Sequence, residues 1–408
     1  MKKMKRSNMP RAVWGVFWAF LAVSAGNYVS QFMALYLTGK LGLGASYSGI
    51  IVSLAGIASL PGIILGGRLS DSWGRKKTFT LFQAMAIVVT VVIILVEDKV
   101  VTPVMIILNS LFISAIYPVC NATIFEVTDE ENRSDSLALF MMGMYIGYML
   151  SDLGCAIGFA KYYRLLYVWE VIMKALSICI FNLAVKLDGE KVNAQGVEKK
   201  QWDEQGTERK REKGLAYILF KNPTLLLFSI SCCLFSMVYT QSSYALPIQM
   251  NSTFGEKRSF YYGIIMIINA FLIATETQWI NKLVKGRDTL NLILFATILV
   301  GGGMGMLYFS SGLPFYITSV MLWSVAYIID TPYAAAYIGG YAPKNMLGRF
   351  ASWIKIVTGA GYALGPILFG YIIEQTNIQN VWRYCIWITV LNVIFLIGIK
   401  VRETLRSK

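Results

Sequence analysis

Long apolar segments separated by short polar ones follow each other along the whole chain. Each is about 20 residues long, the length at which an α-helix crosses a hydrocarbon layer roughly 30 Å thick. Six lie in the first half of the sequence, at residues 12–37, 48–69, 78–96, 101–125, 137–159 and 165–185. Six lie in the second half, at residues 224–247, 261–280, 290–309, 314–338, 350–373 and 381–399. The pattern predicts an all-α polytopic membrane protein with twelve transmembrane helices.

A hydrophilic stretch at residues 187–221 separates the two sets of segments. Its glycines and mixed charges are typical of a solvated linker and not of a catalytic domain. It divides the chain into an N-terminal six-helix bundle, residues 1–186, and a C-terminal six-helix bundle, residues 222–408. The basic N-terminus followed by an apolar run imitates a signal peptide, but the run continues through Leu37 and is long enough to span.

Basic residues indicate the orientation of the helices. With both termini on the inside, 28 of the 37 Lys and Arg residues lie in inner segments, and 7 lie in outer ones. This bias predicts a protein of the cell membrane with both termini in the cytoplasm. It also accounts for the net charge of +14 without nucleic acid, because the basic residues sit in short clusters between apolar runs.

The two halves resemble each other. Pro118 and Arg133 precede the glycine-spaced fifth segment, and Pro332 and Arg349 precede the glycine-spaced eleventh. This is the pattern of a parallel repeat, which predicts two bundles related by pseudo-twofold symmetry. Glycines at intervals of three and four residues predict that the fifth and eleventh helices pack tightly and slide against the opposite half.

One charged turn between the second and third segments carries the most specific pattern. It reads Gly67-x-Leu69-Ser70-Asp71-x-x-Gly74-Arg75-Lys76. This order resembles the loop between the second and third helices of the major facilitator superfamily, although Ser72 stands where that family usually has a basic residue. The resemblance implies that Gly67, Asp71, Gly74 and Arg75 act in gating, with Asp71 meeting the cytoplasmic start of the eleventh helix.

A second pattern, Gly361-x-x-x-Gly365-Pro366-x-x-x-Gly370, is similar to the glycine-proline motif that facilitator exporters usually carry in their fifth helix. Here it lies in the eleventh segment, where Gly361, Gly365 and Pro366 are expected to support conformational change. The corresponding stretch of the fifth segment has Asp152 in place of the proline. The resemblance to bacterial drug exporters implies alternating access and proton-coupled efflux, but the fourth segment lacks their arginine and has Asn109 near that place.

Carboxylates inside the apolar segments are the candidates for proton coupling, because the chain has no histidine. An ionisable group in hydrocarbon costs at least about 2.5–3.5 kcal/mol and therefore needs a partner, a watery cavity or a function. Asp152 could carry a proton or pair with Lys161 or Arg164, and Asp330 could carry one or pair with Lys355. Glu170 and Lys174 have the spacing and order of an intrahelical ion pair.

Uncharged polar and aromatic residues are the candidates for contact with a solute. In the resembled family, the first helix of each triplet lines the cavity, which implies a role for Asn27, Gln31, Tyr239, Gln241, Trp323 and Tyr327. A mostly aromatic cavity with few charges favours a small amphipathic organic molecule.

Other classes of function remain open at this point. A nutrient or sugar symporter would need a denser set of polar residues, and a sensor or lipid scramblase with a transporter fold would move no coupled solute. An enzyme is disfavoured because the six cysteines lie in apolar runs and no metal-ligand spacing occurs. We expect no metal and no cofactor, protons and a small molecule as partners, and a monomer in the bilayer.

Overall fold

The protein is helical throughout the part that its computed structural model describes, residues 9–185, 222–310, 312–341 and 347–406. The first half contains α1 (Arg11–Ala25), α2 (Tyr28–Gln31), α3 (Met33–Gly39), α4 (Ala45–Trp73), α5 (Arg75–Leu95), α6 (Val101–Ser114), α7 (Ile116–Val127) and α8 (Glu130–Ala184). The second half contains α10 (Pro223–Tyr239), η2 (Thr240–Ser242), α11 (Ala245–Phe254), η3 (Gly255–Lys257), α12 (Arg258–Val284), α13 (Thr289–Gly305), η4 (Met306–Phe309), α14 (Leu313–Tyr341), α15 (Leu347–Gln375) and α16 (Ile378–Arg406).

These elements make twelve crossings, as the hydrophobic pattern predicts. Within the described ranges, nine helices are long and apolar enough to span a membrane by themselves. The number is lower than twelve because some crossings are interrupted and others are joined. The fifth and sixth run together in α8, with a break at Tyr162. The seventh and eighth are likewise counted as one length, Pro223–Glu276, and the first is interrupted after the 15 residues of α1. The fourth is divided into α6 and α7 at Ala115 but still counts as one span.

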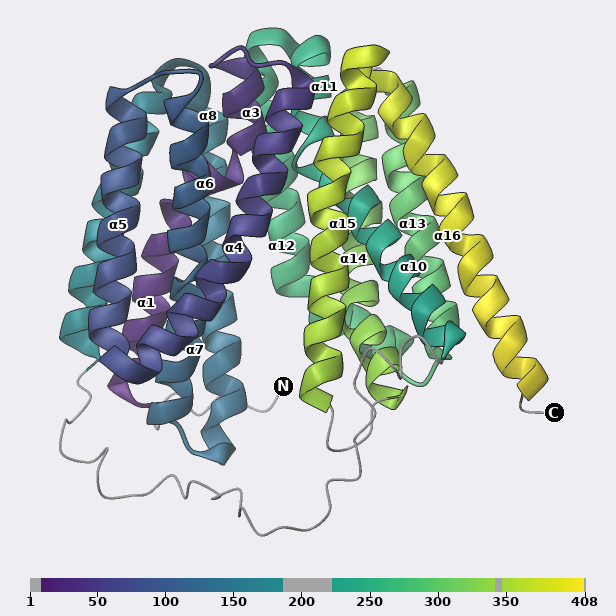
Figure 1. Cartoon of the computed structure of the whole chain (residues 1–408), viewed down its shortest axis with the longest axis horizontal. Coiled ribbons are helices and arrows are strands. Elements are labelled where there is room, and N and C mark those ends of the chain that lie inside the picture. The colour runs from purple at the N-terminus through teal and green to yellow at the C-terminus, as the bar shows by residue number, and fades with distance from the viewer. Residues whose placement is uncertain (1–8, 186–221, 311, 342–346, 407–408) are drawn as a thin grey trace.

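The helices form two groups that stand side by side (Figure 1). Elements α1–α8 make the N-terminal group, and α10–α16 make the C-terminal group. The beginning of α1 and the end of α16 lie at the same end of the molecule, which we call the terminal end; the opposite end is the far end. The expected linker at residues 187–221 lies outside the described residues, so its boundaries stay a prediction.

The glycines of the fifth and eleventh crossings mostly pack within their own group. A Cβ added at Gly147 would lie 2.5 Å from Ser24 Cβ in α1, and one at Gly361 would lie 2.2 Å from the carbonyl oxygen of Cys233 in α10. The expectation that these glycines slide against the opposite half is therefore wrong for most of them. Each lets the fifth helix of a repeat touch the first helix of the same repeat.

Close contact between the groups comes mainly from glycines of the second and eighth crossings, although Gly370 of the eleventh also meets Ala45 in α4. A Cβ added at Gly49 in α4 would lie 2.1 Å from the carbonyl oxygen of Pro366 in α15. One added at Gly263 in α12 would lie 2.6 Å from the carbonyl oxygen of Asp152 in α8. Asp152 and Pro366 hold corresponding places in the two repeats, so these contacts are equivalent under the pseudo-twofold symmetry.

Hydrogen bonds between the groups gather toward the far end. The Ser53 hydroxyl donates to the carbonyl of Ala363 at 2.5 Å, and the Ser46 N–H donates to Glu374 at 3.2 Å. The ribbons of α4 and α15 run together at the far end and diverge toward the terminal end (Figure 1). The two groups are thus held together at the far end in this conformation.

Candidate functional site

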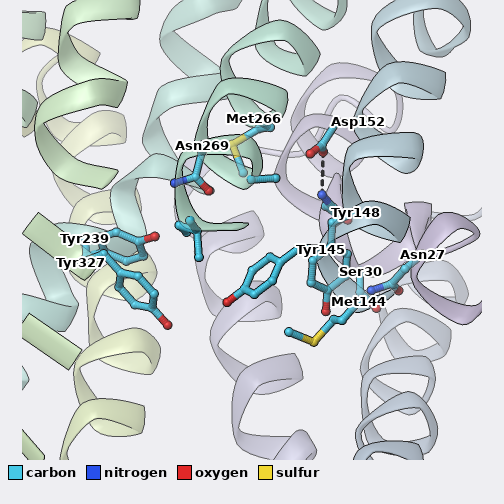
Figure 2. A pocket seen from close by; sticks show the side chains of 13 residues that line it. Asn27, Ser30, Met144, Tyr145, Tyr148, Asp152, Tyr239, Met266, Asn269 and Tyr327 are labelled. Carbon is cyan, nitrogen blue, oxygen red and sulfur yellow. Dashed lines mark hydrogen bonds between the residues drawn. The ribbon is translucent and has the colours of Figure 1, made fainter. Parts of the chain in front are cut away.

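A cavity of about 400 Å³ lies between the two groups near the middle of the helices (Figure 2). Its wall comes from α2, the residue before it and α8 on one side, and from α10, α12 and α14 on the other. The lining residues are Asn27, Ser30, Gln31, Met144, Tyr145, Tyr148, Asp152, Tyr239, Met266, Asn269, Ala270, Ile273 and Tyr327. The volume is within the range of small-molecule sites, and a bound molecule would contact both groups at once.

Asp152 is the carboxylate of this cavity. The residue is only 1% exposed, and its Oδ1 accepts a hydrogen bond of 2.5 Å from Gln31 Nε2, drawn as the dashed line in Figure 2. Its titratable neighbours are Tyr28 in α2, Tyr148 and Cys155 in α8, and Tyr262 in α12, all neutral near pH 7.

No lysine or arginine forms an ion pair with Asp152 among the residues that the structure describes. Arg164, one of the partners considered for Asp152, instead pairs with Glu97 at 2.7 Å. A buried charge without a counter-charge is costly, and uptake of a proton removes that cost. The geometry therefore suits a carboxyl group that gains and loses a proton.

Two helix breaks give the cavity its shape. The first crossing leaves helical geometry at Gly26 and Asn27 before α2 begins, and the seventh tightens into the 3₁₀ turn η2 directly after Tyr239. A Cβ at Gly26 would lie 2.8 Å from Met173 Cβ, so the first break packs against α8 at a place where only glycine fits. The sequence predicts continuous spans here, because the pattern of apolar residues carries no information about contacts between distant helices.

Four of the six expected solute-contacting residues line the cavity, namely Asn27, Gln31, Tyr239 and Tyr327. Tyr239 and Tyr327 stack with ring centroids 4.7 Å apart. Trp323 does not line it; it is 1% exposed and packs edge-on behind Tyr239. Gln241 does not line it either, because residues two positions apart on a helix point to opposite sides. Its side chain donates instead to the carbonyl of Met237.

Several wall residues escaped the sequence analysis. Tyr145 and Tyr148 extend from α8 beside Asp152, and Met266 and Asn269 extend from α12 on the opposite side (Figure 2). The spacing of 145, 148 and 152 places all three on one helical face, a signal that could have found the tyrosines. The residues of α12 offered no comparable signal, because their place in the cavity wall depends on how the two groups of helices pack against each other.

The predicted pair of Glu170 and Lys174 is confirmed. Their charged atoms are 2.6 Å apart, and both side chains are fully buried. Glu170 also accepts a hydrogen bond from the Val29 N–H in α2, and Lys174 donates to Asn109 in α6. The sixth crossing thus brings a cation to Asn109, in a fourth crossing that has no basic residue of its own.

The charged turn where α4 ends and α5 begins forms a local network at the terminal end. Gly74 has φ +90°, which favours glycine, and Arg75 binds Asp71 at 2.6 Å and Glu126 at 3.1 Å. Gly66, the residue before the pattern begins, makes a close backbone approach, since a Cβ there would lie 2.3 Å from the Ala115 carbonyl oxygen, whereas one at Gly67 would meet nothing within 4 Å. Residues 342–346, just before α15, are outside the described ranges, so contact of Asp71 with the start of α15 stays a prediction.

Asp330 and Lys355 do not form the expected ion pair in the part of the chain that the structure describes. Asp330 is 8% exposed, and both residues line a smaller cavity of about 150 Å³ between α10, α14 and α15. The helices are close enough to share a cavity but not to bring the two charges within ion-pair distance.

Comparison with known proteins decides the family. A family model described as Major Facilitator Superfamily matches residues 15–329. The chain belongs to the Major Facilitator Superfamily. It is therefore a multi-pass membrane transporter and not an enzyme.

Relatives of this transporter are distant. A "Na(+), Li(+), K(+)/H(+) antiporter" of Planococcus maritimus is 21% identical over 362 residues, 83% of this chain and 84% of the relative. The uncharacterized MFS-type transporter YhjO of Bacillus subtilis (strain 168) is 23% identical over 371 residues, 88% and 85% of the two chains. Similarity at this level supports the transporter family but assigns no substrate.

Solved structures share the fold of this facilitator. The nucleoside transporter NupG superposes with a TM-score of 0.77 at 15% identity, covering 96% of this chain and 99% of that one. A POT family transporter in complex with 5-aminolevulinic acid gives 0.78 at 13% identity, covering 99% and 98%. The predicted twelve-helix, two-bundle fold is confirmed, whereas the likeness to drug exporters stays a prediction.

Proposed function

We propose that this transporter moves a small amphipathic organic molecule out of the cell by alternating access, in exchange for protons. The observation that carries the proposal is Asp152, a buried carboxylate in the wall of the cavity whose hydrogen-bond donor is an uncharged amide. Protonation from one side and release to the other would couple the proton gradient to the movement of the two groups.

The lining of the cavity supports an amphipathic solute. Tyrosine and methionine side chains make up much of the wall, and Asp152 is its one carboxylic acid among the described lining residues. No donor among the described residues forms a hydrogen bond with the buried acceptors Asn27 Oδ1 and Gln31 Oε1. A solute with an aromatic or aliphatic body and N–H groups would supply these missing donors.

The topology indicates the side of the membrane to which this conformation opens. The Lys and Arg bias favours cytoplasmic termini in the cell membrane, which makes the terminal end the cytoplasmic end. The groups are joined at the far end, so this conformation is the inward-facing one in which an exporter takes up its load. One chain supplies both sides of the cavity, which is consistent with a monomer.

The relatives inform the choice of test solutes. One relative is named as a cation/proton antiporter, and two structural neighbours are a nucleoside transporter and a POT family transporter. Inorganic cations, nucleosides and dipeptides therefore belong in the panel beside amphipathic amines.

The test is proton flux in proteoliposomes that contain a trapped pH-sensitive dye. Ethidium is a suitable probe, because it has a permanent charge and aromatic amino groups and cannot carry protons across lipid by itself. Vesicles with an acidic lumen should become more alkaline when ethidium is added outside, and protein-free vesicles should not. Alkalinisation with Na⁺, Li⁺ or K⁺ instead would assign inorganic cation exchange, and cotransport of protons with a nucleoside or sugar would assign a symporter.

A further inference from the structure

The buried pair of Glu170 and Lys174 connects the sixth crossing to the broken first crossing. One oxygen of Glu170 lies 2.6 Å from Lys174 Nζ. The other accepts a hydrogen bond of 2.9 Å from the backbone N–H of Val29, the second residue of α2. The acid thus joins the lysine and the α2 turn through different oxygens.

Lys174 reaches the same turn by a second route. Its Nζ donates to Asn109 Oδ1 at 2.9 Å and to Thr90 Oγ1 at 2.8 Å. The amide nitrogen of Asn109 then donates to Ser30 Oγ at 3.3 Å. Val29 and Ser30 are consecutive, so the ion pair holds α2 at two adjacent residues.

The α2 turn needs such external contacts. It has four residues, between the break at Gly26 and the end of α2 at Gln31, and a single helical turn has little stability of its own. A Cβ at Gly26 would lie 3.2 Å from the Cα of Glu170, so the backbone before the turn also rests on α8. The next residue after Ser30 is Gln31, which binds Asp152.

We propose that Glu170 and Lys174 are positioning residues that hold the α2 turn so that Gln31 stays on Asp152. They do not contact the cavity; they act through Val29, Asn109 and Ser30. The proposal concerns the geometry of Gln31 and Asp152, and its importance for transport rests on the proton-carrying function proposed above.

Stability alone would not require this pair. Removal of one partner from a buried ion pair is strongly destabilising, whereas replacement of both by apolar residues is often neutral. Glu170→Leu with Lys174→Met should therefore stay folded, yet it removes the acceptor of the Val29 N–H and the lysine that holds Asn109 on Ser30. Glu170→Gln with Lys174→Met is the matched control variant, because the amide oxygen of the introduced glutamine can still accept a hydrogen bond from the Val29 N–H.

The assay needs no substrate. Dicyclohexylcarbodiimide reacts with protonated carboxyl groups in apolar surroundings, and peptide mapping by mass spectrometry reports the rate at Asp152 in the full-length protein. Gln31→Leu removes the hydrogen-bond donor to Asp152 directly, so it shows how much the labelling rate at Asp152 changes when that hydrogen bond is lost. A hydrogen bond to a charged group is strong enough that its loss should change the rate about tenfold.

Glu170→Leu with Lys174→Met should change the labelling rate at Asp152 about as much as Gln31→Leu does. Glu170→Gln with Lys174→Met should keep that rate within about twofold of the rate in the unmodified protein. Glu97→Gln with Arg164→Gln, which removes an exposed pair at the far end, should leave it unchanged. An unchanged rate in the stable double apolar variant would overturn the positioning role. Absence of labelling at Asp152 in the unmodified protein at any pH would instead count against the proton-carrying function.

Discussion

Gly49→Ala should weaken the contact that closes the far end. The added methyl carbon would lie 2.1 Å from the Pro366 carbonyl oxygen, 2.9 Å from its carbonyl carbon and 2.9 Å from the Tyr244 hydroxyl. Ordinary contacts between such atoms are about 3.5 Å, so α4 and α15 must separate by more than about 1 Å. Overpacking of this kind costs about 1–3 kcal/mol, which shifts two balanced conformations about 5- to 150-fold.

Distances between spin labels measure the shift. Tyr47 and Tyr371 are exposed near the far ends of α4 and α15, and Trp73 and Ile356 are exposed on the same helices toward the terminal end. Gly49→Ala should lengthen the first distance and shorten the second. Serine replacement of Cys179, the exposed cysteine, prevents labelling there.

Gly56→Ala is the matched control, because Gly56 lies on the same helix and a Cβ there meets nothing within 4 Å. It changes helix propensity without changing packing, so its distance distributions should match those of the unmodified protein. Identical distributions in Gly49→Ala and Gly56→Ala would refute the idea that the contact of α4 with α15 sets the conformation.

Two further predictions concern charged residues at the ends of the helices. Asp71→Asn removes an exposed ion pair with Arg75 and should leave thermal stability unchanged. If Asp71 helps to close the terminal end, the substitution should lengthen the distance between labels at Trp73 and Ile356. An unchanged distance would exclude a gating role. Hydrogen bonds from Arg164 and Tyr163 hold the pKa of Glu97 below its ordinary value of 4.5. These hydrogen bonds therefore stabilise the folded protein above pH 4.5, and the stabilisation is lost as the pH falls through the lowered pKa. The melting temperature of the unmodified protein should therefore fall more between about pH 5 and about pH 3 than that of Glu97→Gln, and parallel curves would contradict this cause.

The fold was predictable because a membrane leaves the backbone few choices. Backbone groups in hydrocarbon must be satisfied within the helix, so apolar length alone located the crossings. The repeat was readable for a similar reason. Asp152 and Pro366, aligned by their glycine spacing, turn out to make equivalent contacts with Gly263 and Gly49.

The details of the cavity were less predictable, because they depend on contacts between distant residues. Gln31 and Asp152 are 121 positions apart, and their hydrogen bond requires the break at Gly26, which in turn depends on packing against α8. No local pattern records such a break. Gln241 was a different case: it is two positions after Tyr239 and therefore on the opposite side of the helix, which the spacing alone could have shown.

The most direct test of proton coupling compares Asp152→Asn with Asp330→Asn in proteoliposomes, with the panel solute that gives the largest proton signal. Asp330 is a suitable control because it is also a buried carboxylate but lies in the smaller cavity. Asp152→Asn should still exchange solute down its gradient but should show no proton flux and no gradient-driven accumulation, while Asp330→Asn should retain all three. Proton-driven accumulation that persists in Asp152→Asn would contradict the account, and its loss in Asp330→Asn alone would transfer the coupling role to Asp330.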